Sequence, residues 1–350
     1  MSIIMASHIR TPSLGILIFL ILIWTLYSLR ETSVKSSLYS TTTSPISDDV
    51  KDENDRPLVL YAYADGNDEN ARTNLEFFLK HGLHNRADFV FILNGETSAK
   101  DLIPQAKNIR YVQRSNDCYD MGAYSEVLQK DDLYKNYKRF IMLNASIRGP
   151  FMPYYAEGCW SDMYLGRVTD QVKLIGMTVN CSPTLHVQSM ILATDITGLE
   201  VLLYPSDKTL AAYHADPPKT YYQNGRSLPD QVPGMNGCFH DWLSAVTAEI
   251  SLTTLLHRAG YTVDVMMSGF HGVGDGSLEA YENICVDVGD ILWQNKYYGI
   301  NIHPFETIFI KSNRNIAPLT LERHSEWVRA SGYSSYDHCP APRTKSRQVG

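Results

Sequence analysis

Short apolar runs and amphipathic segments alternate along most of this chain, and their order predicts the architecture. Apolar runs predict strands at residues 58–64, 88–93, 109–112, 140–143, 172–179, 187–193 and 261–267. Apolar residues that recur every three or four positions predict helices at residues 69–81, 121–128 and 240–259. Strands that alternate with helices indicate an α/β fold with a mostly parallel, Rossmann-like sheet flanked by helices.

The first 29 residues depart from this pattern. Residues 14–29 are almost entirely apolar (LGILIFLILIWTLYSL), and no charged residue lies between positions 11 and 29. At ~1.5 Å per residue, about 19 helical residues reach roughly 28 Å, which is enough for a thin bilayer. We interpret residues 14–29 as a transmembrane signal-anchor that follows a short tail, residues 1–13. A cleaved signal peptide is the alternative, but Arg30 and Glu31 stand where a small-residue cleavage site would follow.

The layout after the anchor predicts a membrane-tethered lumenal domain. Residues 30–56 are rich in serine and threonine and too polar to fold alone, so they predict a stalk. The folded domain is expected at residues 57–331, and residues 332–350 are expected to form a loose tail. This layout is typical of single-pass type II membrane proteins of the Golgi or ER. The basic residues beside the anchor slightly favour the opposite orientation in the membrane, but we give the layout more weight.

Composition excludes several classes of partner and reaction. The net charge is −7, and no block of lysine and arginine is interleaved with aromatic residues, so no nucleic-acid partner is expected. The motifs of serine hydrolases, P-loop ATPases, HExxH metalloproteases and dinucleotide-binding dehydrogenases are absent. The segment 204–238 is rich in proline and is expected to be irregular.

All six cysteines follow the anchor, at Cys118, Cys159, Cys181, Cys238, Cys285 and Cys339. An even number in a lumenal domain permits disulfides, in 15 pairings if all six are used. Free buried thiols are the alternative. Because no CxxC pair occurs, a zinc site is not expected.

The first candidate site is the stretch RSNDCYDMGAY, residues 114–124, between an expected strand and an expected helix. Its short polar side chains are Asn116, Asp117 and Asp120, and Arg114 precedes them. Gly122 would let the helix begin close to a ligand, with N–H groups that suit a phosphate. The alternative is a turn in which Asp120 caps the helix.

The second candidate site is RFIMLNASIRGPF, residues 139–151, where an apolar strand runs into polar residues. Asn144 and Ser146 can bond sugar or ribose hydroxyls, and Arg148 can neutralise a diphosphate. In an α/β sheet such groups gather at the carboxyl edge, where ligands bind. The alternative is a turn in which Asn144 bonds its own backbone.

The third candidate is Glu249, which shares one helical face with the apolar residues Ala245, Leu252 and Leu256. A carboxylate on an apolar face is costly unless it is used or paired, and burial moves its pKa toward that of a working base. The alternative is a glutamate that reaches solvent or pairs with His257 or Arg258.

A fourth group lies between residues 297 and 314, where His303, Lys311 and Arg314 can form a phosphate or metal clamp. For His303, which precedes a proline, a role as a turn residue is the alternative.

The stretches NDCYDMGAY and FIMLNASIRGPF resemble glycosyltransferases with the GT-A fold, and more narrowly the group around rhamnan synthesis protein F and related eukaryotic type II membrane proteins. The resemblance covers residues 58–314. It implies an enzyme of the Golgi or ER lumen that moves a hexosyl or deoxyhexosyl group from a nucleotide sugar to a glycan or glycoconjugate acceptor. The alternative is a catalytically degenerate GT-A-like domain that binds glycans or acts as a scaffold.

The resemblance also implies roles for particular residues. It places Tyr63, Arg114, Asn116 and Asp120 near the donor. Many inverting members carry a carboxylate base 11 residues before a helix-ending Gly-Tyr pair. Glu249 stands at that distance from Gly260, so the resemblance makes it the base.

The resemblance leaves the metal open. The metal-binding Asp-x-Asp of such enzymes is replaced here by Asn144, Ala145 and Ser146. A Mn²⁺ or Mg²⁺ ion would then depend on Asp117 or Asp120. Without an ion, the charge of the leaving diphosphate would be met by Arg148, by Lys311 or by the helix start near Gly122.

Overall fold

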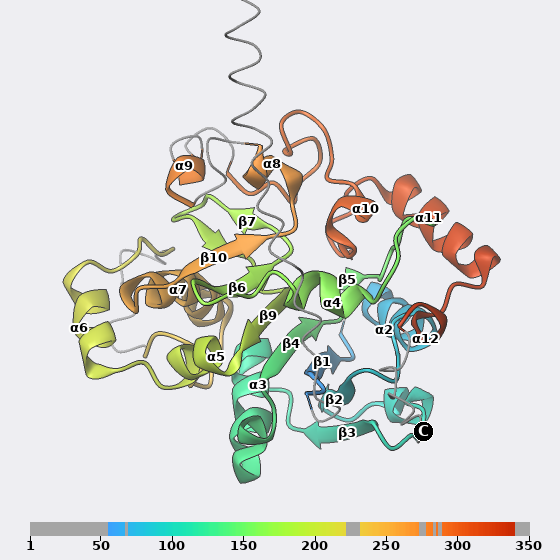
Figure 1. Cartoon of the computed structure of the whole chain (residues 1–350), viewed down its shortest axis with the longest axis horizontal. Helices are drawn as coiled ribbons and strands as arrows, with labels where there is room; N and C mark the ends of the chain where they lie inside the picture. The colour runs from blue at the N-terminus through green and yellow to red at the C-terminus, as the bar shows by residue number, and fades with distance from the viewer. Residues whose placement is uncertain are drawn as a thin grey trace, which may run out of the picture. The chain divides into compact units, whose positions relative to one another are not determined.

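Figure 1 shows the computed structural model of the chain, which describes residues 55–66, 69–221, 232–272, 278–282, 285 and 289–339. The expected tail 1–13, the anchor 14–29 and the stalk up to residue 54 lie outside the described residues. Within the described part, no helix combines the length and the apolar character that crossing a membrane requires.

A seven-stranded sheet forms the centre of the domain, in the order β10-β6-β9-β4-β1-β2-β3. Its strands are β1 (Leu58–Ala64), β2 (Asp88–Asn94), β3 (Ile109–Arg114), β4 (Arg139–Asn144), β6 (Val172–Gly176), β9 (Ile191–Asp195) and β10 (Thr262–Val265). Only β9 runs antiparallel to its neighbours in this sheet. The prediction of a mostly parallel sheet is therefore confirmed.

The central strands are apolar along their whole length because both of their faces are covered. Residues 58–63 of β1 and residues 140–144 of β4 are all buried. Continuous apolar runs are what parallel strands with helices on both faces require. β3, at the edge of the sheet, exposes three of its six residues instead.

The apolar runs 172–179 and 187–193 each divide into two strands, unlike the single strands expected. β7 (Val179–Asn180) and β8 (His186–Val187) leave the main sheet and pair with each other as an antiparallel hairpin. The hairpin packs tightly on the sheet, because a Cβ at Gly176 would lie 2.1 Å from Cγ1 of Val187. Burial continues through both parts, so the apolar pattern does not reveal the change of direction.

Two helical layers cover the sheet. α7 (Trp242–Arg258) contacts both α3 (Tyr119–Gln129) and α5 (Ile196–Leu203), and these helices lie on one face. α2 (Glu69–His81) and α4 (Trp160–Leu165) lie on the other face, where Phe78 and Trp160 form an edge-to-face ring pair. The three helices expected from the sequence are present as α2, α3 and α7.

Smaller elements surround these layers. They are η1 (Ser98–Leu102), η2 (Lys130–Asn136), α6 (Asp207–Ala215), α8 (Ser268–His271), α9 (Leu278–Glu282), α10 (Pro304–Thr307), α11 (Pro318–Ser331), α12 (Ser335–His338) and the two-stranded ribbon of β5 (Ile147–Arg148) and β11 (Ile310–Lys311). α6 lies inside the segment 204–238, which was expected to be irregular. Its cap, Ser206, accepts a hydrogen bond from the N–H of Thr209.

The six cysteines form three disulfides, Cys118–Cys238, Cys159–Cys339 and Cys181–Cys285, so none is a free thiol. Each disulfide joins residues more than a hundred positions apart, and long loops of this kind constrain the unfolded chain most strongly. The first residues of the expected loose tail, 332–339, include α12 and are held to α4 through Cys339. Residues 340–350 lie outside the described residues.

Candidate functional site

A cavity of about 1000 Å³ opens at the carboxyl edge of the sheet. Ala62 and Ala64 line it from β1, and Asn144 lines it from the end of β4. Met190 lies at the same edge because it precedes the antiparallel strand β9. The remaining walls come from the start of α3, the β7–β8 hairpin, the first half of α7 and residues 289–296 and 311–314. This is the edge at which the sequence placed its polar groups.

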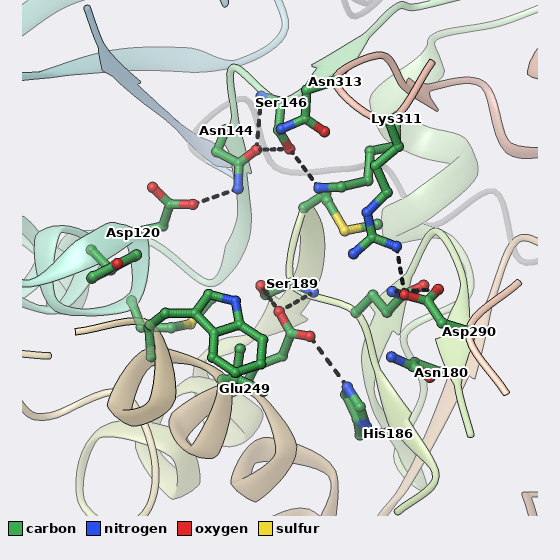
Figure 2. Close-up of a pocket in the computed structure, with 18 of the residues that line it drawn as sticks. Asp120, Asn144, Ser146, Asn180, His186, Ser189, Glu249, Asp290, Lys311 and Asn313 are labelled. Carbon is green, nitrogen blue, oxygen red and sulfur yellow. Dashed lines mark hydrogen bonds and ion pairs between the residues drawn. The ribbon is translucent and has the colours of Figure 1, made fainter. Parts of the chain in front are cut away.

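Asn144 connects the turn after β4 to the start of α3 (Figure 2). Its Nδ2 donates to Oδ2 of Asp120 at 2.5 Å. Its Oδ1 accepts from the N–H of Ser146 at 3.0 Å and from the Ser146 hydroxyl at 2.6 Å. Asn144 thus bonds the backbone of its own turn, which was the alternative to a ligand-binding role. It also holds two neighbouring polar groups in the cavity.

Asp120 faces the cavity and does not cap its helix. The N-cap of α3 is Cys118, in a left-handed conformation, and its side chain makes no capping bond. Burial raises the pKa of Asp120 to about 6, against the opposing effects of the Asn144 hydrogen bond and the Lys311 charge. The charge of Glu249 adds to the rise.

Glu249 points from α7 into the cavity (Figure 2). Its Oε1 lies 3.2 Å from Nε2 of His186, and its Oε2 accepts from the Ser189 hydroxyl and from the Ser189 N–H at 3.3 Å. Burial alone raises the pKa of Glu249, but the hydrogen bonds from His186 and Ser189 and the charge of Lys311 outweigh it. The net effect lowers the pKa, so the carboxylate is ionised at neutral pH.

His186 orients this carboxylate. Its Nδ1 lies 2.7 Å from the carbonyl oxygen of Thr184, while its Nε2 faces Glu249. Both partners are acceptors, and the ring lies between them. The expected alternative partner of Glu249, Arg258, pairs with Asp216 at 2.6 Å instead.

Lys311 brings a positive charge to the same cavity from β11. Its Nζ donates to the Ser146 hydroxyl at 3.3 Å. Burial lowers the pKa of Lys311 to about 8 with help from the nearby Arg314 charge, and Glu249, Asp120 and Asp290 oppose the change. The ammonium therefore remains the main form at neutral pH.

Arg314 also lines the cavity, whereas His303 does not. The Arg314 guanidinium pairs with Asp290 at 2.5 Å and lies 4.7 Å from the centre of the Trp293 ring. His303 caps α10, and its Nε2 lies 2.9 Å from Nε2 of His324. Of the expected clamp, Lys311 and Arg314 are together in the cavity, and His303 takes the alternative role of a turn residue.

Several residues expected near the donor do not line this cavity: Tyr63, Arg114, Asn116, Asp117, Gly122 and Arg148. Arg114 is buried and joins β3 to α3, because its guanidinium bonds Glu126 at 2.6 Å and Asp117 at 2.8 Å. The Tyr63 hydroxyl donates to Asp65 at 2.5 Å.

Gly122 and Arg148 have roles in packing. A Cβ at Gly122 would lie 2.6 Å from the carbonyl oxygen of Gly237, so α3 requires a small residue where it packs. Arg148 is buried, with Nε donating to Oδ1 of Asn74 at 2.9 Å, and it lines a separate cavity of about 370 Å³. Of the three expected sources of positive charge, Lys311 and the start of α3 line the main cavity, and Arg148 does not.

The described residues of the cavity do not fit a divalent cation. Asn144 uses its carbonyl on Ser146 and presents its NH₂ to Asp120. The other two carboxylates of the lining are held by basic groups, Glu249 by His186 and Asp290 by Arg314. In the described part of the chain, groups of three potential ligand atoms occur only where cysteines are already in disulfides, at His84–Cys159–Cys339 and Asp117–Cys118–Cys238.

The sequence did not single out several lining residues: His186, Ser189, Asp290, Trp242, Trp293 and Tyr221. Trp242 could have been found, because it lies seven residues before Glu249 on the same helical face. Ser189 lies in the run 187–193, which was predicted as a plain strand, and His186 directly precedes that run. Their proximity to Glu249 depends on how the hairpin packs against α7.

No protein-family model matches the sequence, and no curated protein matches it. Among solved structures, two crystal structures of the glycosyltransferase GlyE from Streptococcus pneumoniae TIGR4 are similar to this chain. One of them is the apo form, and each has 8% identity and a TM-score of 0.39. The matches cover 79% and 81% of this chain but only 64% and 66% of the GlyE chains. A likeness this distant carries no argument about activity.

Proposed function

We propose that this domain is a GT-A-like glycosyltransferase that moves a sugar from a nucleotide-sugar donor to a glycan or glycoconjugate acceptor, with inversion at the anomeric carbon. One observation carries the proposal. Glu249, singled out by its place on an apolar helical face and by its spacing from Gly260, is an oriented and ionised carboxylate in the main cavity. That cavity lies at the sheet edge where α/β proteins bind their ligands.

Glu249 acts as the general base. An acceptor hydroxyl gives its proton to the carboxylate while its oxygen bonds to the anomeric carbon. The bond from that carbon to the diphosphate breaks at the same time, and the nucleoside diphosphate leaves with the electron pair. His186 and Ser189 hold the carboxylate in place, which limits the reorganisation that proton transfer requires.

Lys311 and Ser146 bind the diphosphate. The Lys311 ammonium lies beside the Ser146 hydroxyl and is largely buried, and a preorganised positive charge in such a place stabilises developing negative charge. Asn144 and Asp120 remain for the hydroxyl groups of the donor. Because the described donor set does not fit a cation, no step is assigned to a metal.

We further propose that the chain is a type II membrane protein of the Golgi or ER, held by residues 14–29 with the domain in the lumen. The three disulfides support an oxidising compartment, because disulfides are rare in cytosolic proteins. The acidic net charge gives no support to a nucleic-acid partner.

Glu249→Gln tests the role of the base. The substitution keeps the size and the hydrogen bond from Ser189 but removes the proton acceptor, so transfer should fall about 100-fold or more. Transfer from a panel of nucleotide sugars is measured together with calorimetric binding of the same donors. Glu322→Gln, which lies outside the main cavity, serves as the matched control.

Donor binding should survive in Glu249→Gln. Full transfer by this variant would reject the role of Glu249. If the unaltered domain binds no nucleotide sugar with or without Mn²⁺, the transferase itself is rejected in favour of a glycan-binding or scaffolding module.

A further inference from the structure

A second cavity, of about 720 Å³, lies next to the main one. Ser182 and Gly289 line both cavities, so the two meet at these residues. The Cys181–Cys285 disulfide belongs to the wall of the second cavity and fixes this boundary covalently.

One face of α7 runs along both cavities. Trp242, Ala245 and Glu249 face the main cavity, and Thr253 and His257 continue the same face into the second. Their spacing of three and four residues is that of a single helical face. A ligand that extends along α7 from Glu249 would therefore enter the second cavity.

An aromatic pair lines the main cavity, an exposed tryptophan, Trp242, and a half-buried tyrosine, Tyr221. Trp242 has 55% of its surface exposed, and its ring lies 5.6 Å from that of Tyr221. The Tyr221 hydroxyl donates to the carbonyl oxygen of Ser182 at 3.0 Å, which places the pair where the two cavities meet. A large exposed apolar surface beside a polar cavity indicates a binding site, and a flat indole suits the C–H face of a sugar ring.

The second cavity carries groups that bond hydroxyls. Its lining includes Thr254, His257 and Glu282, and the ion pair between Arg258 and Asp216. A mixture of donors and acceptors with no excess of one charge suits a neutral polyhydroxylated ligand better than a phosphate, which would require a cluster of basic residues.

We propose that the acceptor is an oligosaccharide that occupies both cavities. Its reacting sugar lies between Glu249 and Trp242, and the following sugars enter the second cavity. The inference rests on the proposed function, and it adds that this enzyme extends glycan chains in preference to single sugars.

Acceptor length provides the test. Once the donor panel has identified a donor, transfer is measured to chains of one to five sugars built from N-acetylglucosamine, galactose or mannose. In the unaltered protein, KM for the accepted series should fall about tenfold or more from one sugar to three, as a few added hydrogen bonds predict. Hydrolysis of the donor without acceptor is measured in parallel.

Two variants separate the parts of the site. Thr254→Trp places an indole in the second cavity, which should block a sugar chain there and abolish the gain with length, while leaving transfer to a single sugar unchanged. Trp242→Ala should raise KM for acceptors of every length about tenfold, and Trp242→Phe should restore it. Thr320→Trp and Trp327→Ala, on α11 and outside both cavities, are the matched controls.

The outcomes distinguish this inference from the proposed function. If the protein hydrolyses the donor but its KM for acceptors does not depend on their length, the inference is overturned and the proposed transferase function stands. Length dependence that survives in Thr254→Trp would also overturn it. If the protein neither binds nor hydrolyses any donor, the proposed function has failed instead.

Discussion

The two faces of the β5–β11 ribbon carry basic residues with opposite roles. Arg148 pairs with Ile310 across the ribbon, and Lys311 pairs with Ile147. Successive residues of a strand point to opposite faces, so the two cations point in opposite directions although they are neighbours in space. Lys311 reaches the main cavity, and Arg148 reaches the buried side chains of Asn74 and Ser325.

This difference shows that a basic residue beside a strand end does not by itself identify a phosphate site. The Arg148 guanidinium holds together α2, β5 and α11, so its charge is committed to packing. The Lys311 ammonium contacts one hydroxyl, that of Ser146, and lines a cavity with three carboxylates. Which side of the ribbon a residue occupies decides whether its charge serves a ligand or the fold.

Lys311→Met should have the largest effect. Loss of the ammonium removes the charge that faces the leaving diphosphate, so kcat should fall about 100- to 1000-fold, as when one preorganised donor is lost. Initial rates at saturating donor measure the change. Lys311→Arg should recover part of the rate because it keeps the charge, and Lys208→Met on α6 is the control. An unchanged kcat in Lys311→Met would show that Lys311 does not serve the leaving diphosphate and that the two faces of the ribbon do not differ in this way.

Arg148→Met should destabilise the protein and leave catalysis intact. The substitution leaves the buried Asn74 Oδ1 without this donor, so the free energy of unfolding should fall by about 1–3 kcal/mol. Urea denaturation measures the change, with the exposed Arg323→Met as the control, where about 0.5 kcal/mol or less is expected. If instead kcat falls as far as in Lys311→Met, the two faces do not differ in role.

The pH dependence of kcat should reflect Lys311. Because its pKa is lowered to about 8, the ammonium loses its proton as pH rises through that value, and the rate should fall about tenfold per pH unit above it. Glu249 causes no loss of rate at alkaline pH, since its lowered pKa keeps the carboxylate ionised there. In Lys311→Arg the alkaline loss should move to higher pH, and an alkaline limb that stays in place would assign it to another group.

Chelation should have the smallest effect. The charge of the leaving group is assigned to Lys311, so donor affinity and kcat should be the same in EDTA and in Mn²⁺. Calorimetry of nucleoside diphosphate binding under both conditions measures the affinity independently of turnover. Loss of binding in EDTA would return the site to a cation held near Asp120 and Asn144, and would contradict the role of Lys311.

The sequence anticipated the strands of the main sheet, the helices α2, α3 and α7 and the cavity edge because these depend on local patterns. Continuous apolar runs mark the central strands, and the polar residues that follow β4 lie at the edge where parallel strands end. Glu249 could be found because it is polar on an otherwise apolar helical face. By contrast, α6 lay hidden in a proline-rich segment, and the β7–β8 hairpin lay hidden in continuous apolar runs.

The sequence by itself therefore determined the order of the main strands and of the helices α2, α3 and α7, and the candidacy of Glu249, since periodicity acts over a few residues. Tertiary structure alone decided which candidates meet. His186 lies 63 positions from Glu249, and Ser146 lies 165 positions from Lys311. Contacts over such distances depend on how the hairpin and the ribbon pack on the sheet. The same packing turned Arg148, Arg114 and Gly122 away from the cavity and left Lys311 inside it.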